Sequence, residues 1–205
     1  MPAKPLGPGM QLLTTSSLET PLSTRSFIGR PNGPTFTGVY VHWDGYPSNQ
    51  LPLLLAAFTY KFRRDLNAMT AHLVDDAPGW SFLGTDLLDD APEAIRLELA
   101  PRGDDPSEPT GGPERQIVTT ESTSGLAWGY VLRPAGIEVI SLPYASQGPL
   151  VDWNVDPRAH FNNDPFIWSS LAETRGAPRI TPAPPTPVAM PSTVPGSSPR
   201  AAARR

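Results

Sequence analysis

Apolar residues recur at steps of three and four along residues 51–73, which is the spacing of one face of an α-helix. The series comprises Leu51, Leu54, Leu55, Phe58, Phe62, Leu66, Met69 and Leu73. On the opposite side of the same helix fall Lys61, Arg63, Arg64 and Asp65. The pattern predicts an amphipathic helix that packs on a core. Because Thr59 and Tyr60 have weak helix propensity, a pair of helices that meets near residues 59–61 fits the same residues.

Two pairs of short apolar segments, one before and one after this helix, have the pattern of β-hairpins. The first pair begins near Ser23 and ends at Trp43, and its turn is Arg-Pro-Asn-Gly-Pro at residues 30–34. The second pair, residues 126–132 and 137–142, is separated by Arg-Pro-Ala-Gly. Proline and glycine at these points interrupt strand pairing and allow the backbone to reverse. Each pair is therefore predicted to form an antiparallel hairpin.

Together these elements predict an α+β fold, in which a small antiparallel sheet from two hairpins carries the amphipathic helix, or helix pair, on one face. We expect a further strand at residues 116–120. At residues 95–99 apolar and charged residues alternate, so a short strand is expected there as well. Residues 165–173 either form a short helix capped by Asp164 or belong to an irregular arm.

Proline and glycine usage limits the folded part of the chain. Of the 205 residues, 27 are proline and 17 are glycine, and they concentrate outside the periodic segments. We expect a flexible lead at residues 1–22 and a single domain at residues 23–172, within which residues 85–114 form an acidic loop. Residues 173–205 are expected to be a disordered, proline-rich, basic tail.

The charge balance and the missing residue types exclude several functions. A net charge of −4 makes a nucleic-acid partner unlikely for the domain as a whole, although the basic tail with Arg63 and Arg64 keeps weak nucleic-acid binding as an alternative. The absence of cysteine excludes disulfides and thiol catalysis. His42, His72 and His160 have no zinc or iron spacing, so no metal site is expected and no cofactor is identified.

No stretch of the sequence approaches the roughly 20 apolar residues that cross a bilayer. The first fifteen residues also lack the apolar run and cleavage signature of a secretory signal. We therefore expect a cytoplasmic protein without a membrane-spanning segment.

The junction between the first hairpin and the helix concentrates polar chemistry. Asp44-Gly45 is a turn dipeptide, in which the glycine is free to adopt positive φ. Side chains two apart on a strand share a face, so His42 and Asp44 are expected to emerge together, with Tyr46 close by. These three residues form a candidate ligand-binding cluster. An ordinary hydrogen-bonded turn explains the same residues without any ligand.

The sequence Tyr-Val-His-Trp-Asp-Gly-Tyr-Pro at residues 40–47 and the segment Ser-Thr-Arg-Ser at residues 23–26 carry a family resemblance. With Leu-Gly at residues 83–84 and the aromatic segment 127–131, the chain resembles a group of small uncharacterised proteins of tailed bacteriophages and bacteria, including actinobacteria. The resemblance covers residues 23–142 and implies a fold and a phage or bacterial setting. It implies no activity. The long lead, the proline near the helix start, the acidic insertion and the tail depart from the group's pattern.

Three functions compete at this point. The first is a non-enzymatic accessory protein that binds a small ligand or a protein partner at the His42, Asp44 and Tyr46 turn. The second is a small hydrolase or nucleotide-processing enzyme, with His42 as general base, Asp44 as its orienting group and Tyr46 as a donor. In that version Arg25 is the next group expected near His42. The third is weak nucleic-acid binding through the basic tail.

Overall fold

Eight strands and four helices make up the part of the chain that the computed structural model describes, which is residues 24–100, 105–112 and 114–173. The strands are β1 (Ser26–Asn32), β2 (Thr35–Val41), β3 (Trp80–Phe82), β4 (Glu108–Pro109), β5 (Ile117–Thr119), β6 (Trp128–Arg133), β7 (Gly136–Ser141) and β8 (Leu150–Asp152). The helices are α1 (Pro47–Thr59), α2 (Leu66–Thr70), α3 (Glu93–Leu99) and α4 (Pro165–Glu173), with a π turn, η1 (Ala71–Asp75), and a 3-10 turn, η2 (Thr85–Leu88). The predicted α+β class is confirmed.

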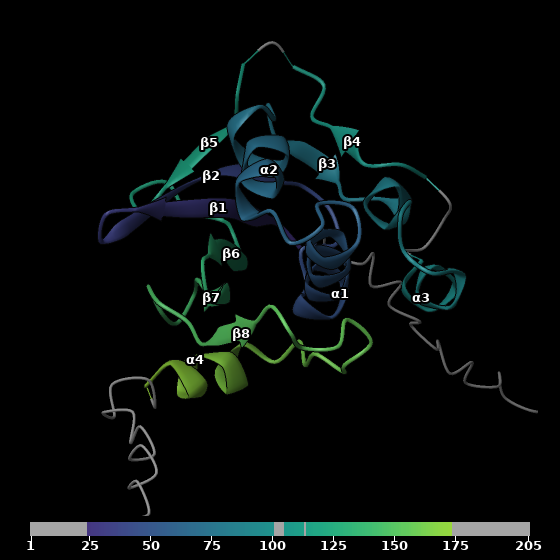
Figure 1. The fold of residues 1–205 in the computed structure, drawn as a ribbon. Coiled ribbons are helices and arrows are strands. Elements are labelled where there is room, and N and C mark those ends of the chain that lie inside the picture. The colour runs from purple at the N-terminus through teal and green to yellow at the C-terminus, as the bar shows by residue number, and fades with distance from the viewer. Residues whose placement is uncertain (1–23, 101–104, 113, 174–205) are drawn as a thin grey trace, which may run out of the picture.

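The strands form one sheet in the order β4-β3-β2-β1-β6-β7-β8, and β5 pairs with β2 (Figure 1). Both predicted hairpins are present. The first turn is shorter than expected, since Arg30 and Pro31 belong to β1 and only residues 33–34 reverse the chain between Asn32 and Thr35. The second hairpin closes between Arg133 and Gly136.

The sheet is larger than the predicted small antiparallel sheet, and it is mixed. β1 pairs in parallel with β6, and β2 pairs in parallel with β3 at Val41 and Trp80. A parallel pair needs a long crossover, and the segment between β2 and β6 supplies it. The added strands β3, β4 and β8 have only two or three residues each, too few for a periodic pattern.

Helix α1 is buried on nearly all sides, which corrects the prediction of an amphipathic helix. Pro47 and residues 50–58 are all buried, so α1 reaches the surface only at Ser48 and Asn49 in its first turn and at Thr59 in its last. The helix lies between the sheet and the shell made by η2 and α3. A helix that is enclosed on nearly all sides is apolar around most of its circumference and lacks a polar, solvent-facing side.

The predicted break near residues 59–61 is confirmed, since α1 ends at Thr59 and α2 begins at Leu66. Asp65 caps α2, and its Oδ1 accepts hydrogen bonds from the amides of Asn67 at 2.9 Å and Ala68 at 3.0 Å. The charged residues assigned to a helix face therefore lie in the connection between two helices. The expected Asp164 cap of α4 is also confirmed, by a 2.9 Å bond from the Phe166 amide.

Residues 95–99 form part of α3 and not a strand. Their alternation of apolar and charged residues also suits a helix, because Ile95 and Leu99 are four residues apart and share its inner face. Leu97, which a strand would place beside them, is 76% exposed. The predicted acidic loop thus contains η2, α3 and β4. The predicted lead, residues 1–22, and the predicted tail lie outside the described residues, apart from Glu173 at the end of α4.

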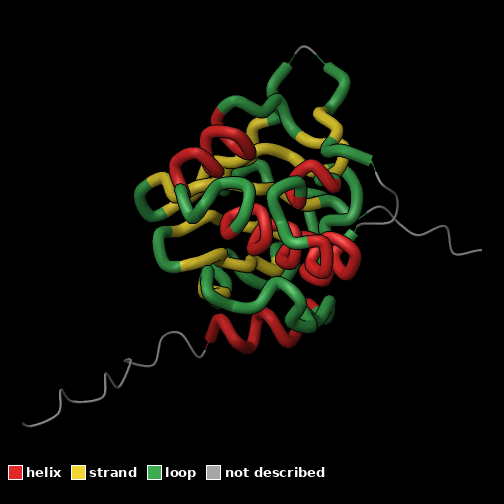
Figure 2. Tube along the Cα trace, turned by 45° about the vertical axis from the view of Figure 1, so that its right-hand side comes forward, coloured by secondary structure: helices red, strands yellow, loops and turns green. Residues whose placement is uncertain are grey.

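The sheet carries a core on each face. The larger cluster, on the helix side, takes from the strands Ile28, Val39, Val41, Trp80, Trp128, Tyr130, Leu132, Ile137 and Val139. The smaller cluster, on the other face, consists of Phe27, Phe36, Val118, Leu126, Val131 and Ile140. Helix α4 lies beside β7 and β8, apart from the other helices (Figures 1 and 2). Within the described residues, no helix has the length and apolar content to span a membrane.

The enclosure of α1 makes a prediction about stability. Leu54→Ala removes a fully buried side chain and is expected to lower the free energy of unfolding by about 3 kcal/mol. Leu97→Ala makes the same substitution at the exposed position on α3 and is expected to change it by less than about 0.5 kcal/mol. Urea unfolding followed by circular dichroism measures both. Equal effects would contradict the arrangement of α1 inside the helical layer.

Candidate functional site

The turn after β2 is held by hydrogen bonds to the residue Thr24, just before β1, and to Tyr130 in the middle of β6. The amide of Gly45 donates to the carbonyl of Thr24 at 2.9 Å, just before β1. The hydroxyl of Tyr130, on β6, donates to the carbonyl of Gly45 at 2.7 Å. Tyr130 is fully buried, and burial raises the pKa of its phenol well above the usual 10.0, so it stays protonated as a donor. The turn is therefore fixed to the centre of the sheet.

Gly45 is required because the backbone approaches β1 closely. A Cβ atom at this position would lie 2.6 Å from the Thr24 carbonyl oxygen and 2.7 Å from Ser26 Oγ. Asp44, one residue earlier, has φ of 56°, a left-handed conformation that aspartate tolerates better than most residues. This conformation ends the regular alternation of side chains along β2 and redirects the backbone toward α1.

A cavity of about 670 Å³ opens beside this turn. Its walls come from the turn, the first half of α1, the end of β3 with the residue after it, the end of α3 and two loops. The lining residues are Trp43, Asp44, Tyr46, Ser48, Asn49, Gln50, Pro52, Leu53, Phe82, Leu83, Glu98, Leu99, Ala100, Asp105 and Asn163. The cavity thus lies where the buried helix α1 reaches the surface.

Gln50 is the most deeply buried polar group in the cavity wall. The residue is 1% exposed, and its Nε2 donates to the Asp44 carbonyl at 3.1 Å. Its Oε1 is buried and has no hydrogen-bond partner among the described residues. An unpaired buried acceptor costs about 1–3 kcal/mol, which a donor in the cavity would offset.

Asn163 joins the cavity from the loop before α4. Its Oδ1 accepts from the Ser48 amide at 2.9 Å, and its Nδ2 donates to Ser48 Oγ at 2.9 Å. This pair fastens the late loop to the first turn of α1. Asn163, Glu98 and Asp105 belong to segments that the sequence pattern left without a function, since nothing in their local spacing connects them to the turn.

The acidic wall at Asp105 is held by Asp86 in η2. Asp86 Oδ1 accepts from the Ser107 amide at 2.6 Å, and Lys61 Nζ donates to Asp86 Oδ2 at 2.9 Å. The Thr85 amide donates to the Asp105 carbonyl at 3.0 Å. Burial acts to raise the pKa of Asp86, but the hydrogen bonds from Ser107 and Lys61 outweigh it and hold the pKa below the usual 3.8.

The predicted trio of side chains does not all line this cavity. Asp44 and Tyr46 are in its wall, whereas His42 is not among the lining residues. His42 Nδ1 instead lies 2.7 Å from the hydroxyl of Tyr40, which packs against the sheet's smaller cluster. Burial raises the pKa of that phenol, and the positive charge of Arg25 acts in the opposite direction. Arg25 therefore acts on Tyr40 and does not line the cavity, and its expected place beside His42 stays a prediction.

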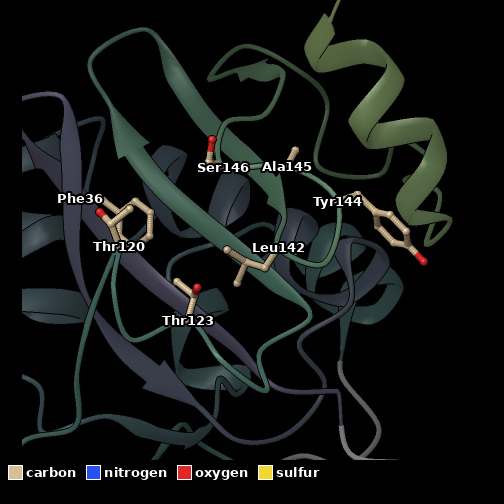
Figure 3. A pocket seen from close by; sticks show the side chains of 7 residues that line it. All are labelled: Phe36, Thr120, Thr123, Leu142, Tyr144, Ala145 and Ser146. Carbon is tan, nitrogen blue, oxygen red and sulfur yellow. The ribbon is translucent and has the colours of Figure 1, made fainter.

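A second, smaller hollow of about 240 Å³ lies on the other side of the sheet (Figure 3). Its lining residues are neutral: Phe36, Thr120, Thr123, Leu142, Tyr144, Ala145 and Ser146. The ring of Tyr144 points away from the hollow toward α4, where it packs on Phe166 with ring centres 4.5 Å apart. This hollow has fewer converging polar groups than the cavity beside Asp44.

Comparison of the chain with protein-family models, with curated proteins and with solved structures gave no match. The resemblance carried by residues 23–26 and 40–47 therefore stays an expectation. Fold and cavity define this chain as an α+β protein with one large mixed polar and apolar cavity in its described part.

The hydrogen bond that holds the turn is testable. Tyr130→Phe leaves the Gly45 carbonyl without its donor and is expected to cost about 1–3 kcal/mol of unfolding free energy. It should also speed hydrogen exchange of the Gly45 amide. Tyr144→Phe, at a 51% exposed position, is the control and is expected to change neither quantity measurably. Similar changes in unfolding free energy and amide exchange for both variants would show that the Tyr130 hydrogen bond does not fix the turn.

The Asp86 contacts predict a pH dependence. Because the pKa of Asp86 is lowered in the folded state, its stabilisation is present above pH 3.8 and is lost as the pH falls through the folded-state pKa. The difference in unfolding free energy between wild type and Asp86→Asn should therefore shrink below pH 3.8. Denaturant titrations from pH 2 to 7 measure it, with the exposed Asp90→Asn as control. A difference that grows in acid would contradict this assignment.

Proposed function

We propose that the protein is a non-enzymatic binding module that takes up a small organic ligand in the cavity beside Asp44. The observation that carries this proposal is the combination of a 670 Å³ space with Gln50 in its wall, a buried residue whose Oε1 has no hydrogen-bond partner among the described residues. Ligand sites usually have volumes of about 300–1,000 Å³ and a largely apolar lining with a few fixed polar groups. The volume of the cavity lies in this range, and its lining combines apolar and polar groups in about equal measure.

Two aromatic side chains at the cavity support this function. Trp43 is 47% exposed and Tyr46 is 38% exposed, although their rings are among the largest apolar groups of the chain. Exposed aromatic rings beside a cavity are typical of ligand sites, because a ligand that covers them gains much apolar contact. The other four tryptophans are buried, so Trp43 differs from them in environment.

The rigidity of the turn is a second support. Gly45 is bonded to the segment before β1 and to β6, and Asn163 is bonded to Ser48. A wall that is already ordered loses little conformational entropy when a ligand arrives. These contacts make the turn suitable as a preformed ligand site. A turn without a ligand would not need to be held so firmly.

A hydrolase is the alternative function, and the contacts of its expected general base, His42, give it less support. A general base has to lie within hydrogen-bond reach of the substrate. His42 is bonded to Tyr40, on the side of β2 that faces the smaller cluster, and does not line the cavity that holds Asp44 and Tyr46. The binding function needs no such convergence, so it is the better supported of the two.

Nucleic-acid binding has little support from the described residues. The Arg64 guanidinium donates to Asn154 and lies 5.5 Å from the centre of the Phe58 ring. These contacts hold the guanidinium within the molecule. Arg63, the other proposed contact in the domain, is exposed, and the basic tail is outside the described residues.

The proposal is tested with a fragment library and ¹⁵N-labelled full-length protein. We expect some fragments to shift the indole N–H resonance of Trp43 and not those of the buried tryptophans. Asn49→Trp places a large side chain at an exposed lining position and is expected to weaken these fragments roughly tenfold, about 1.4 kcal/mol. Asn67→Trp, the same substitution at an exposed position on α2 outside the lining, is the control and should leave binding unchanged.

Two outcomes would overturn the proposal. One is that no fragment in the library shifts the Trp43 resonance. The other is that fragments shift it equally in wild type and in Asn49→Trp, which would mean that they bind outside the cavity.

A further inference from the structure

We infer that the ligand of this cavity is an organic cation, an amine or guanidinium carried on an apolar or aromatic body. This inference rests on the proposed function and names the class of ligand. It follows from the charges, the acceptors and the aromatic groups that line the cavity.

The charged groups of the cavity wall are all acidic among the described residues. Asp44, Glu98 and Asp105 line the space, and none of its other described lining residues is lysine, arginine or histidine. A concave surface with charges of one sign concentrates the field and attracts the opposite charge. The cavity therefore favours a positively charged ligand over a neutral or anionic one.

Two cations near the cavity, Lys61 and Arg158, are already paired in the part of the chain that the structure describes. Lys61 is bonded to Asp86, and its ammonium lies 2.9 Å from that carboxylate. The charge of Glu98 helps to raise the pKa of Arg158, so this guanidinium lies within electrostatic range of the cavity. Arg158 nevertheless makes a two-point contact with Asp156, at 3.0 and 2.7 Å, and does not line the cavity.

The hydrogen-bonding groups add a second, independent argument. Gln50 Oε1 is buried without a partner among the described residues, and it is an acceptor, as are the three carboxylates. The last torsion of a glutamine side chain is soft, so Oε1 is able to turn toward a donor in the cavity at the expense of the 3.1 Å bond from Nε2 to the Asp44 carbonyl. Ammonium and guanidinium groups carry several donors and no acceptor. Their hydrogen bonding thus complements the wall.

The spacing of the acids favours an extended cation over a metal ion. A calcium or magnesium ion needs oxygen ligands at about 2.0–2.6 Å from one centre. Among the described residues, no three acidic or histidine side chains are grouped closely enough to hold a metal ion. An organic cation does not need such a cluster, because its charge and its apolar body contact different parts of the wall.

The aromatic and apolar residues define the rest of the ligand. Trp43 and Tyr46 expose ring surface at the cavity, and a cation over such a ring gains cation–π attraction. Leu53 and Phe82 supply apolar surface in the same wall. A ligand with a cationic group and an apolar or aromatic body satisfies both halves of the cavity.

Three probes of matched shape and different charge test the inference: phenethylamine, 2-phenylethanol and 3-phenylpropionate. With ¹⁵N-labelled full-length protein, we expect phenethylamine to shift the Trp43 indole resonance with an affinity at least about threefold higher than that of 2-phenylethanol, as expected for exposed charge pairs. The anionic probe should bind most weakly. Added salt should weaken phenethylamine selectively, because the carboxylates are exposed.

Paired variants locate the effect. Glu98→Gln with Asp105→Asn removes two cavity charges and is expected to weaken phenethylamine about three- to tenfold. Asp90→Asn with Glu114→Gln removes two exposed charges outside the lining and should change its affinity less than twofold. Unshifted indole resonances of Trp80, Trp128 and Trp153, which are buried, will report that both variants fold.

Several results would overturn the cationic class. These are equal affinity for phenethylamine and 2-phenylethanol, preference for 3-phenylpropionate, no response to phenethylamine, or a calcium-induced shift of Trp43 that the cavity double variant abolishes. The fragment screen separates this failure from that of the binding function. If neutral or anionic fragments bind in the cavity, only the cationic class is wrong. If no fragment binds there, the binding function itself is wrong.

Discussion

The close approach of Gly45 to β1 is the constraint on which the rest of the structure depends. Only a residue without a side chain allows the backbone at this point to lie against Thr24 and Ser26. The buried hydroxyl of Tyr130, on β6, donates to the carbonyl of Gly45 and fixes the turn from the other side. The chain consequently leaves the sheet in one direction and enters α1 at Pro47. A turn held this firmly provides a rigid edge for the cavity.

The burial of α1 explains why the cavity lies where it does. A helix enclosed by the sheet on one side and by η2 and α3 on the other meets solvent only at its ends. Its first turn carries Ser48, Asn49 and Gln50, whose polar groups have to be satisfied by neighbouring segments or by a ligand. Asn163 provides a hydrogen-bond acceptor for the Ser48 amide, whereas the side-chain oxygen of Gln50 stays without a partner among the described residues.

The pleat of β2 explains the separation of His42 from the cavity. Tyr40 and His42 contact each other on the side of the smaller cluster, while Val39 and Val41 face the helices. The sequence argument extended this alternation to Asp44, but β2 ends at Val41 and Asp44 adopts a left-handed conformation. Regular alternation does not continue through such a residue. The prediction that His42 and Asp44 share a face assumed a continuous strand, and the strand has already ended before these residues.

By itself the sequence determined the two hairpins, the break after Thr59 and the cap at Asp164, because each depends on turn and capping residues that are neighbours in the chain. Only the tertiary structure decided the parallel pairing of β1 with β6, the enclosure of α1 and the gathering of Glu98, Asp105 and Asn163 around Asp44. These contacts join segments that are far apart in the chain, from η2 against α1 to Asn163 beside Asp44, and no local period or propensity encodes which distant surfaces meet.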